Sequence, residues 1–177
     1  MSSKVKEYVS LTRYESPCGT LVLGSYEGRL CLCDWDIANR HRMAVDRRIA
    51  LRIRTVYREF EAPLNVTAAR QLDEYFAGRR RSFDVPLLFL GTEFQKSVWS
   101  ALCEIPYGTT TSYGKVAETV GHPKAHKAVA NACAANAIAL FVPCHRVTLG
   151  VGDSGDYSGG SKAKEYLLAL EQANAGR

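Results

Sequence analysis

The sequence of 177 residues lacks several features that would place it in a specialised class of protein. No stretch reaches the roughly 20 uninterrupted apolar residues that span a membrane, and the first eight residues are too polar for a signal peptide. The six cysteines show no disulfide-scaffold spacing, and Cys31 and Cys33 have no second cysteine or histidine pair to complete a zinc site. We therefore expect a cytoplasmic protein with reduced cysteines, no metal and no membrane partner.

What the sequence does contain is the composition of a globular protein. Hydrophobic residues make up 46% of the chain and charged residues 23%, enough to build a sizeable core in one domain or two small ones. The formal net charge of +5 is compatible with a polyanionic partner, but it suits a protein without such a partner equally well. Charge alone therefore leaves the partner open.

The first ninety residues indicate a small sheet followed by a helix. Two apolar runs, 21–23 and 30–33, flank a polar turn and predict an antiparallel strand pair within residues 9–36. The arginine-rich segment 40–58 fits a basic strand or an amphipathic helix equally well, and its type stays open.

A helix is expected next, with Asn65 or Thr67 as its cap and an end at Gly78. Residues 83–90 contain a proline and indicate an extended linker or edge structure. We place the domain boundary here, which gives an amino-terminal domain over 1–90 and a carboxy-terminal domain over 91–177.

The second half carries a pattern of short helices. Thr92 begins a region of helical apolar spacing, and Ser112 can cap a second helix. A turn at 121–123 and an alanine-rich helix over about 125–135 follow. Helix, tight turn and helix in this order predict a helix-turn-helix. The alanines let this last helix approach a DNA groove closely or pack against the core, and both interpretations stay open.

Cys144 follows an apolar run, 137–142, that is expected to be a buried strand ended by Pro143. A thiol becomes a good nucleophile when a neighbouring group takes its proton. His145 is adjacent, but neighbouring side chains in an extended backbone point in opposite directions. Contact between the two side chains therefore requires a turn or a bridging water, and the pair alone is weak evidence of catalysis.

The wider sequence resembles the O6-alkylguanine-DNA alkyltransferase family over about residues 15–171. Residues 143–147, Pro-Cys-His-Arg-Val, match the active-site signature of that family. Other matching motifs are Ser16-Pro17-Cys18-Gly19, Tyr75-Phe76-Ala77-Gly78, Phe83-Asp84-Val85-Pro86-Leu87, Phe94-Gln95, Val98-Trp99, Ile105-Pro106-Tyr107-Gly108, Ser112-Tyr113-Gly114, Tyr157-Ser158-Gly159-Gly160 and Leu167-Leu168.

The resemblance implies an α+β fold with two parts. These are an amino-terminal ribonuclease H-like antiparallel sheet domain and a mostly helical carboxy-terminal domain with a winged helix-turn-helix-like motif. It also implies direct DNA repair without a cofactor: an alkyl group passes irreversibly from O6-alkylguanine, and from O4-methylthymine, to Cys144. The target base would be flipped out of the duplex, and one molecule would repair one base.

The resemblance further assigns roles to individual residues. His145 would deprotonate Cys144 through a water, and Glu171 would orient the imidazole. The other catalytic residues implied are Tyr113, as proton donor to the leaving guanine, and Asn136, at a hinge. The remaining assignments are Val147, Tyr157, Ser158 and Lys164 for substrate binding, and Lys127, Ala128, Ala134 and Tyr113 for DNA binding by a monomer through the minor groove.

Some positions depart from the family pattern. Lys127 stands where many members have an arginine that inserts into the duplex, and lysine lacks the planar stacking fork, so we expect weaker support of the extruded base. Ala130, Asn131 and Ala137 stand where glycines and a proline are common. These changes affect the depth of the helix in the groove rather than the chemistry.

Two other classes of function remain as alternatives. One is a protein that binds DNA lesions without repairing them, although the relatives of that kind lack the cysteine that is present here. The other is a hydrolase that uses Cys144 and His145 with turnover.

Overall fold

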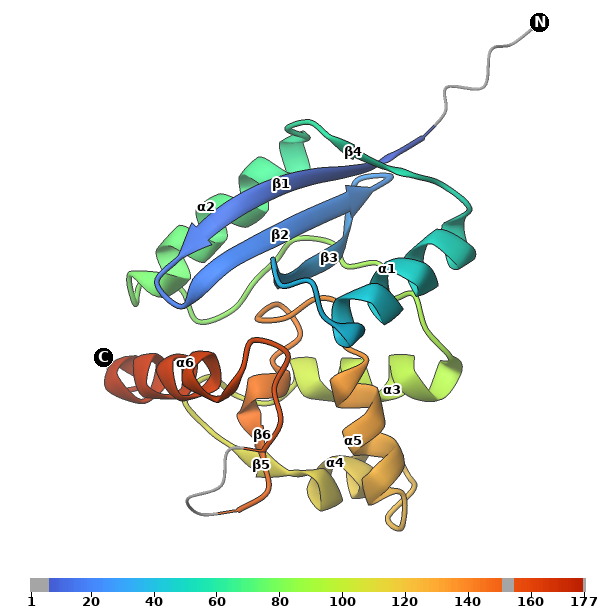
Figure 1. Ribbon diagram of the computed structural model, residues 1–177. Helices are drawn as coiled ribbons and strands as arrows, with labels where there is room; N and C mark the ends of the chain where they lie inside the picture. Colours follow the sequence, from blue (N-terminus) through green and yellow to red (C-terminus); the bar gives the residue numbers. More distant parts are fainter. Residues whose placement is uncertain (1–6, 151–154, 177) are drawn as a thin grey trace, which may run out of the picture.

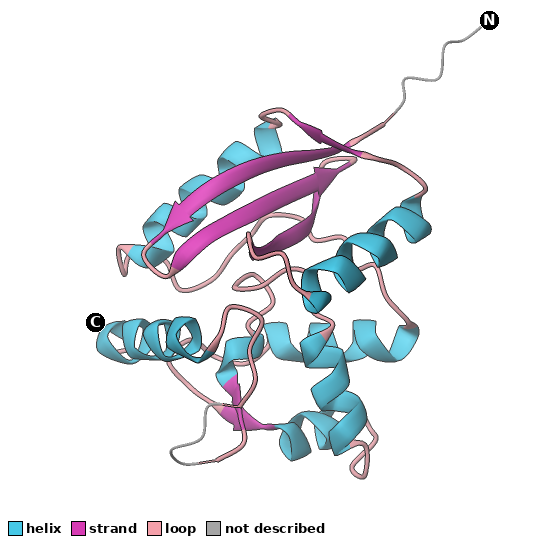
Figure 2. Cartoon of the chain, in the orientation of Figure 1, coloured by secondary structure: helices cyan, strands magenta, loops and turns pink. Residues whose placement is uncertain are grey.

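The structure is a computed structural model that describes residues 7–150 and 155–176, and Figures 1 and 2 show the arrangement of its elements. Strands gather in the amino-terminal half and helices dominate the carboxy-terminal half. Across the described ranges, no helix is both long and apolar enough to cross a membrane. The expected α+β fold is confirmed.

The amino-terminal half is built on a four-stranded sheet in the order β3-β2-β1-β4. Strands β1 (Val9–Ser16), β2 (Gly19–Tyr26) and β3 (Arg29–Trp35) are antiparallel, as the sequence predicts. The β2–β3 hairpin turns at Glu27 and Gly28, which both have positive φ, as a two-residue hairpin turn requires. Strand β4 (Tyr57–Glu59) pairs with β1 in parallel, so the sheet is mixed.

The basic segment that the sequence left open is a helix, α1 (Arg40–Ile53), followed by the short strand β4. Asn39 caps α1 by accepting a hydrogen bond from the backbone N–H of Arg42. Only Val45 and Ile49 of this helix are buried, which is why its many arginines are tolerated on the remaining surface.

Helix α2 (Pro63–Phe76) packs against β1 and β2, and its predicted start was wrong. Neither Asn65 nor Thr67 caps it, because the helix begins earlier, with Pro63 at its first position, where a missing N–H costs nothing. Asn65 is instead buried and donates hydrogen bonds to Ser10 and Thr12 of β1. The predicted end is confirmed, since Gly78 follows the helix with φ +72°.

The helical half begins with α3 (Glu93–Cys103), which Thr92 caps in a reciprocal pair of hydrogen bonds with Gln95. Ser112 caps α4 (Tyr113–Thr119), and α5 (His126–Ala134) follows after a short turn and packs on both α3 and α4. The predicted helix-turn-helix is therefore present. Strands β5 (Thr111–Ser112) and β6 (Val147–Thr148) pair in parallel, and α6 (Ser161–Asn174) closes the chain.

The apolar run 137–142 is buried as predicted, but it is not a regular strand. Ala139 forms a bridge back to Val142, and the tight turn between them places Leu140 at φ +67°. The same segment bonds to the sheet, because Cys33 donates to the carbonyl of Ala137 and accepts from the N–H of Ala139. An apolar run indicates burial but does not distinguish a strand from a buried turn. This contact joins the two halves directly before Cys144.

Candidate active site

Cys144 begins a single 3-10 turn, Cys144–Arg146, and its side chain is almost completely buried. The amide of Asn136 donates to the Cys144 Sγ at 3.2 Å and to the carbonyl oxygen of Val142 at 2.9 Å. Its Oδ1 accepts from the N–H of Ile138 at 2.9 Å. Asn136 therefore fixes the buried turn and the thiol together, as the hinge role expected for it would require.

The ring of His145 contacts α6. Its Nε2 lies 2.8 Å from Glu171 Oε1, and both side chains are buried. The ionised carboxylate can only accept, so Nε2 carries the proton and Nδ1 keeps a free lone pair. Nδ1 has no hydrogen-bond partner within the described residues. The histidine is thus arranged as a neutral base with one ring nitrogen held and the other available.

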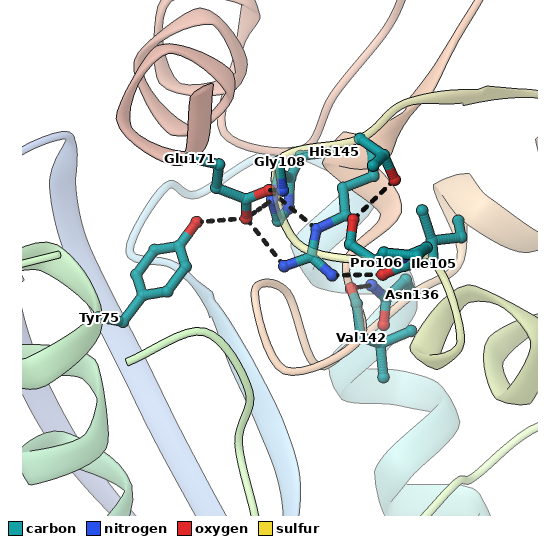
Figure 3. Close-up of polar contacts among 10 residues, drawn as sticks. Tyr75, Ile105, Pro106, Gly108, Asn136, Val142, His145 and Glu171 are labelled. Carbon is teal, nitrogen blue, oxygen red and sulfur yellow. Dashed lines mark hydrogen bonds and ion pairs between the residues drawn. The ribbon is translucent and has the colours of Figure 1, made fainter. Parts of the chain in front are cut away.

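Glu171 collects donors from several parts of the chain, and Figure 3 shows them converging on its carboxylate. Arg146 donates through Nε at 2.9 Å and through Nη2 at 3.0 Å, in a bidentate pair. Tyr75 of α2 donates from its hydroxyl at 2.8 Å, and the N–H of Gly108 donates at 3.1 Å. The orientation of His145 therefore depends on both halves of the protein.

These contacts set the charges of the three central residues. Burial raises the pKa of Cys144 to about 11, although the Asn136 hydrogen bond and the charge of Lys164 oppose this. Burial also lowers the pKa of His145. Burial alone would raise the pKa of Glu171, but hydrogen bonds from His145 and Arg146 hold it at about 2. The thiol is therefore protonated at neutral pH and needs a base to become a nucleophile.

Cys144 lies in the wall of a pocket of about 390 Å³. Of the predicted site residues, the pocket brings together Cys144 with Tyr113, Ala134, Tyr157 and Ser158. Its other lining residues are His41, Ala130, Asn131, Cys133, Leu149 and Asp156. The reactive sulfur therefore faces a space bordered by α1, α4, α5 and the segment before α6.

Other predicted residues lie outside this lining. Lys164 is buried and donates from Nζ to the carbonyl of Val147 at 2.7 Å, so it supports the backbone after the 3-10 turn. Lys127 and Ala128 are exposed on α5. Lys127 and Ala128 therefore lie outside the pocket that Tyr157 and Ser158 line.

Sequence reasoning assigned no role to three residues that the structure brings to the site: Arg146, Tyr75 and His41. Arg146 and Tyr75 occur in the quoted motifs, which was the signal available for them. His41 had no such signal, because only the fold brings α1 to the pocket.

Together, the fold and the site define a class of protein: a two-part chain in which a buried cysteine, followed by a histidine bound to a glutamate, lines a pocket beside a helix-turn-helix. Two family models match it. The ribonuclease-like domain of 6-O-methylguanine DNA methyltransferase matches residues 9–89, and the DNA binding domain of the same protein matches residues 93–173. The chain belongs to the 6-O-methylguanine DNA methyltransferase family.

Individual relatives agree with this. The methylated-DNA–protein-cysteine methyltransferase of Methanosarcina acetivorans is 56% identical over 104 residues, which cover 59% of this chain and 67% of the relative. The Mycobacterium tuberculosis protein of the same name is 49% identical over 108 residues, 61% of this chain and 66% of its own. A crystal structure of Mycobacterium tuberculosis OGT in complex with DNA is similar with a TM-score of 0.77 and 36% identity, covering 94% of each chain.

Proposed function

We propose that this chain repairs DNA by transferring an alkyl group from O6 of guanine to the Sγ of Cys144, irreversibly and once per molecule. The observation that carries the proposal is the buried Cys144 in the pocket wall, next to a neutral His145 whose Nε2 is held by Glu171. The names of the relatives, methylated-DNA–protein-cysteine methyltransferases, support the same chemistry. O4-methylthymine is proposed as a second substrate.

The reaction needs one displacement and two proton transfers, one from the thiol and one to the leaving guanine. The thiol proton of Cys144 passes through a water to Nδ1 of His145, and the thiolate attacks the alkyl carbon. The new C–S bond forms as the C–O6 bond breaks, and guanine leaves as an anion that a donor must protonate. Tyr113, at the start of α4 in the pocket lining, is the proposed donor. Tyr157 and Ser158 line the same pocket and would contact the base.

The proposed path of the DNA follows one face of α5. Lys127, Ala128, Asn131 and Ala134 are exposed on this helix, and Asn131 and Ala134 also line the pocket. A duplex on this face would therefore present a flipped nucleotide to Cys144. The alanines allow the close approach that a minor groove demands, and Lys127 adds a charge toward the phosphates. We propose that the protein acts here as a monomer, in the cytoplasm.

The test is a duplex with one O6-methylguanine whose methyl group is labelled. We expect label on the protein, at no more than about one per molecule, located on Cys144 by mass spectrometry of peptides. Cys144→Ala should abolish transfer, whereas Cys103→Ala, at an exposed cysteine of α3, should leave it unchanged. Release of labelled methanol with turnover would favour a hydrolase. Tight binding without transfer would favour a lesion-binding protein.

A further inference from the structure

A second histidine–carboxylate pair lies at the wall of the same pocket. His41, in the first turn of α1, places its Nε2 3.1 Å from Oδ2 of Asp34 on β3. The Asp34 side chain is only 2% exposed, whereas His41 is 21% exposed and lines the pocket that contains Cys144. The amino-terminal half therefore contributes a polar side chain to a pocket formed mainly by the other half.

Asp34 has few partners for a buried carboxylate. Neither of its carboxylate oxygens accepts a hydrogen bond of standard geometry within residues 7–150 and 155–176, and the ring of His41 is the group against it. Nε2 of His41 is itself buried, so the exposed part of the ring is its other side. The imidazole therefore places Nε2 against Asp34, and its exposed side, which carries Nδ1, borders the pocket.

The pair lies near the sulfur. Burial is the main cause of the raised pKa of Cys144, and the negative charge of Asp34 adds to it. Because Sγ attacks the alkyl carbon of the adduct, a side chain that lines the pocket together with Cys144 can face the alkyl group. His41 is such a side chain and is available to contact the transferred alkyl group.

We propose that His41 is a specificity-determining residue that favours O6-alkyl groups bearing a hydroxyl, such as 2-hydroxyethyl. With Nε2 held by Asp34, Nδ1 accepts a hydrogen bond when the ring is neutral and donates one when it is protonated. A hydroxyl can serve as either partner, so the contact forms in both states. An apolar alkyl group of the same size would leave Nδ1 without a partner in the closed pocket. This proposal rests on the proposed function.

The experiment compares two adducts of nearly equal size, O6-(2-hydroxyethyl)guanine and O6-propylguanine, in the same duplex. The rate constant for transfer is measured for each, and the ratio of hydroxyethyl to propyl is the readout, because the ratio cancels changes in DNA binding. We expect the wild-type ratio to exceed one, and His41→Leu to lower it about tenfold. Met43→Leu, at a 70% exposed position of the same helix, is the matched control and should keep the wild-type ratio.

The remaining outcomes of this experiment would contradict either the specificity proposal or the proposed function. If His41→Leu slows both adducts equally, the residue contacts the nucleotide backbone or supports the pocket, and the specificity proposal is wrong. An unchanged ratio in a folded variant contradicts it as well. His41→Gln, which retains hydrogen-bonding atoms, should keep more of the ratio than leucine does. Failure of the wild type to accept either adduct while it repairs O6-methylguanine also contradicts the specificity proposal, whereas failure with O6-methylguanine as well contradicts the proposed function itself.

Discussion

Two histidine–carboxylate pairs lie near Cys144, one through the adjacent His145 and one through the pocket-lining His41, and they are built in opposite ways. The pair His145–Glu171 is buried, and its carboxylate accepts hydrogen bonds from four different residues. In the pair His41–Asp34 the carboxylate oxygens lack hydrogen bonds of standard geometry among the described residues, and the histidine is partly open to the pocket.

We propose that the two pairs differ because they have different roles. A base must be held in one orientation and one tautomer, which requires a carboxylate that is itself immobilised, as Arg146 and Tyr75 immobilise Glu171. A residue that contacts variable substrates needs only one fixed ring nitrogen and one free one. We therefore propose that a histidine–carboxylate pair serves proton transfer in one place and recognition in the other.

Breaking the first pair is expected to give the largest effect. Glu171→Gln replaces the acceptor-only carboxylate by a neutral amide that can also donate, so the proton is no longer kept on Nε2 of His145, and we expect the rate of alkyl transfer to fall by about a hundredfold or more. It also leaves Arg146 buried without its carboxylate, which should lower the free energy of unfolding by about 3 to 5 kcal/mol. Single-turnover kinetics and urea denaturation measure the two effects.

The control is another acid-to-amide change, Glu93→Gln, at an exposed ion pair with Lys96 of α3. It should alter the free energy of unfolding by less than about 0.5 kcal/mol and leave the transfer rate intact. Equal losses in the two variants would mean that the carboxylate network around Glu171 contributes nothing special.

The free energy of unfolding should depend on pH because of the pair His145–Glu171. The folded pKa of Glu171, about 2, lies below its usual 4.5, so its contribution is complete above about pH 4.5 and is lost as the pH falls toward 2. Burial also lowers the pKa of His145, so the unfolded chain binds a proton first and stability declines below about pH 6.5. Urea midpoints of the wild type should therefore decrease on acidification, and Glu171→Gln should lack the decrease below pH 4.5. Parallel curves for both proteins would contradict this assignment.

Lys127→Ala is expected to change the binding of DNA while it leaves both histidine–carboxylate pairs intact. Lys127 is exposed on α5, outside the pocket. We expect repair of duplex O6-methylguanine to slow by about tenfold, since a cation near the phosphates is lost, while reaction with free O6-benzylguanine keeps its rate. Equal loss on the two substrates would show that Lys127 acts on the pocket rather than on extrusion of the base.

Local signals in the sequence were sufficient for much of the fold. Thr92 and Ser112 cap their helices as predicted, because a cap and the periodicity after it lie within a few residues. The buried turn before Cys144 was mistaken for a strand, since Leu140 at positive φ leaves no trace in an apolar run.

The site was harder to predict because its contacts are long-range. Tyr75 and Glu171 are 96 positions apart, and nothing local to either residue indicates the hydrogen bond between them. His145 and Glu171 were connected only through the resemblance to a family. The sequence did not indicate a role for His41, because its position in the pocket with Cys144 depends on the direction that the chain takes from β3 into α1.

Asp34→Asn should have the smallest effect on stability, despite changing a residue as buried as Glu171. No hydrogen bond of standard geometry to its oxygens is lost among the described residues. We expect the free energy of unfolding to change by less than about 1 kcal/mol, against several for Glu171→Gln, when both are measured by urea denaturation at neutral pH. The hydroxyethyl-to-propyl ratio should nevertheless fall, because an amide no longer fixes which ring nitrogen of His41 faces the pocket. A stability loss as large as that of Glu171→Gln would mean that Asp34 supports the fold, and the contrast between the two pairs would disappear.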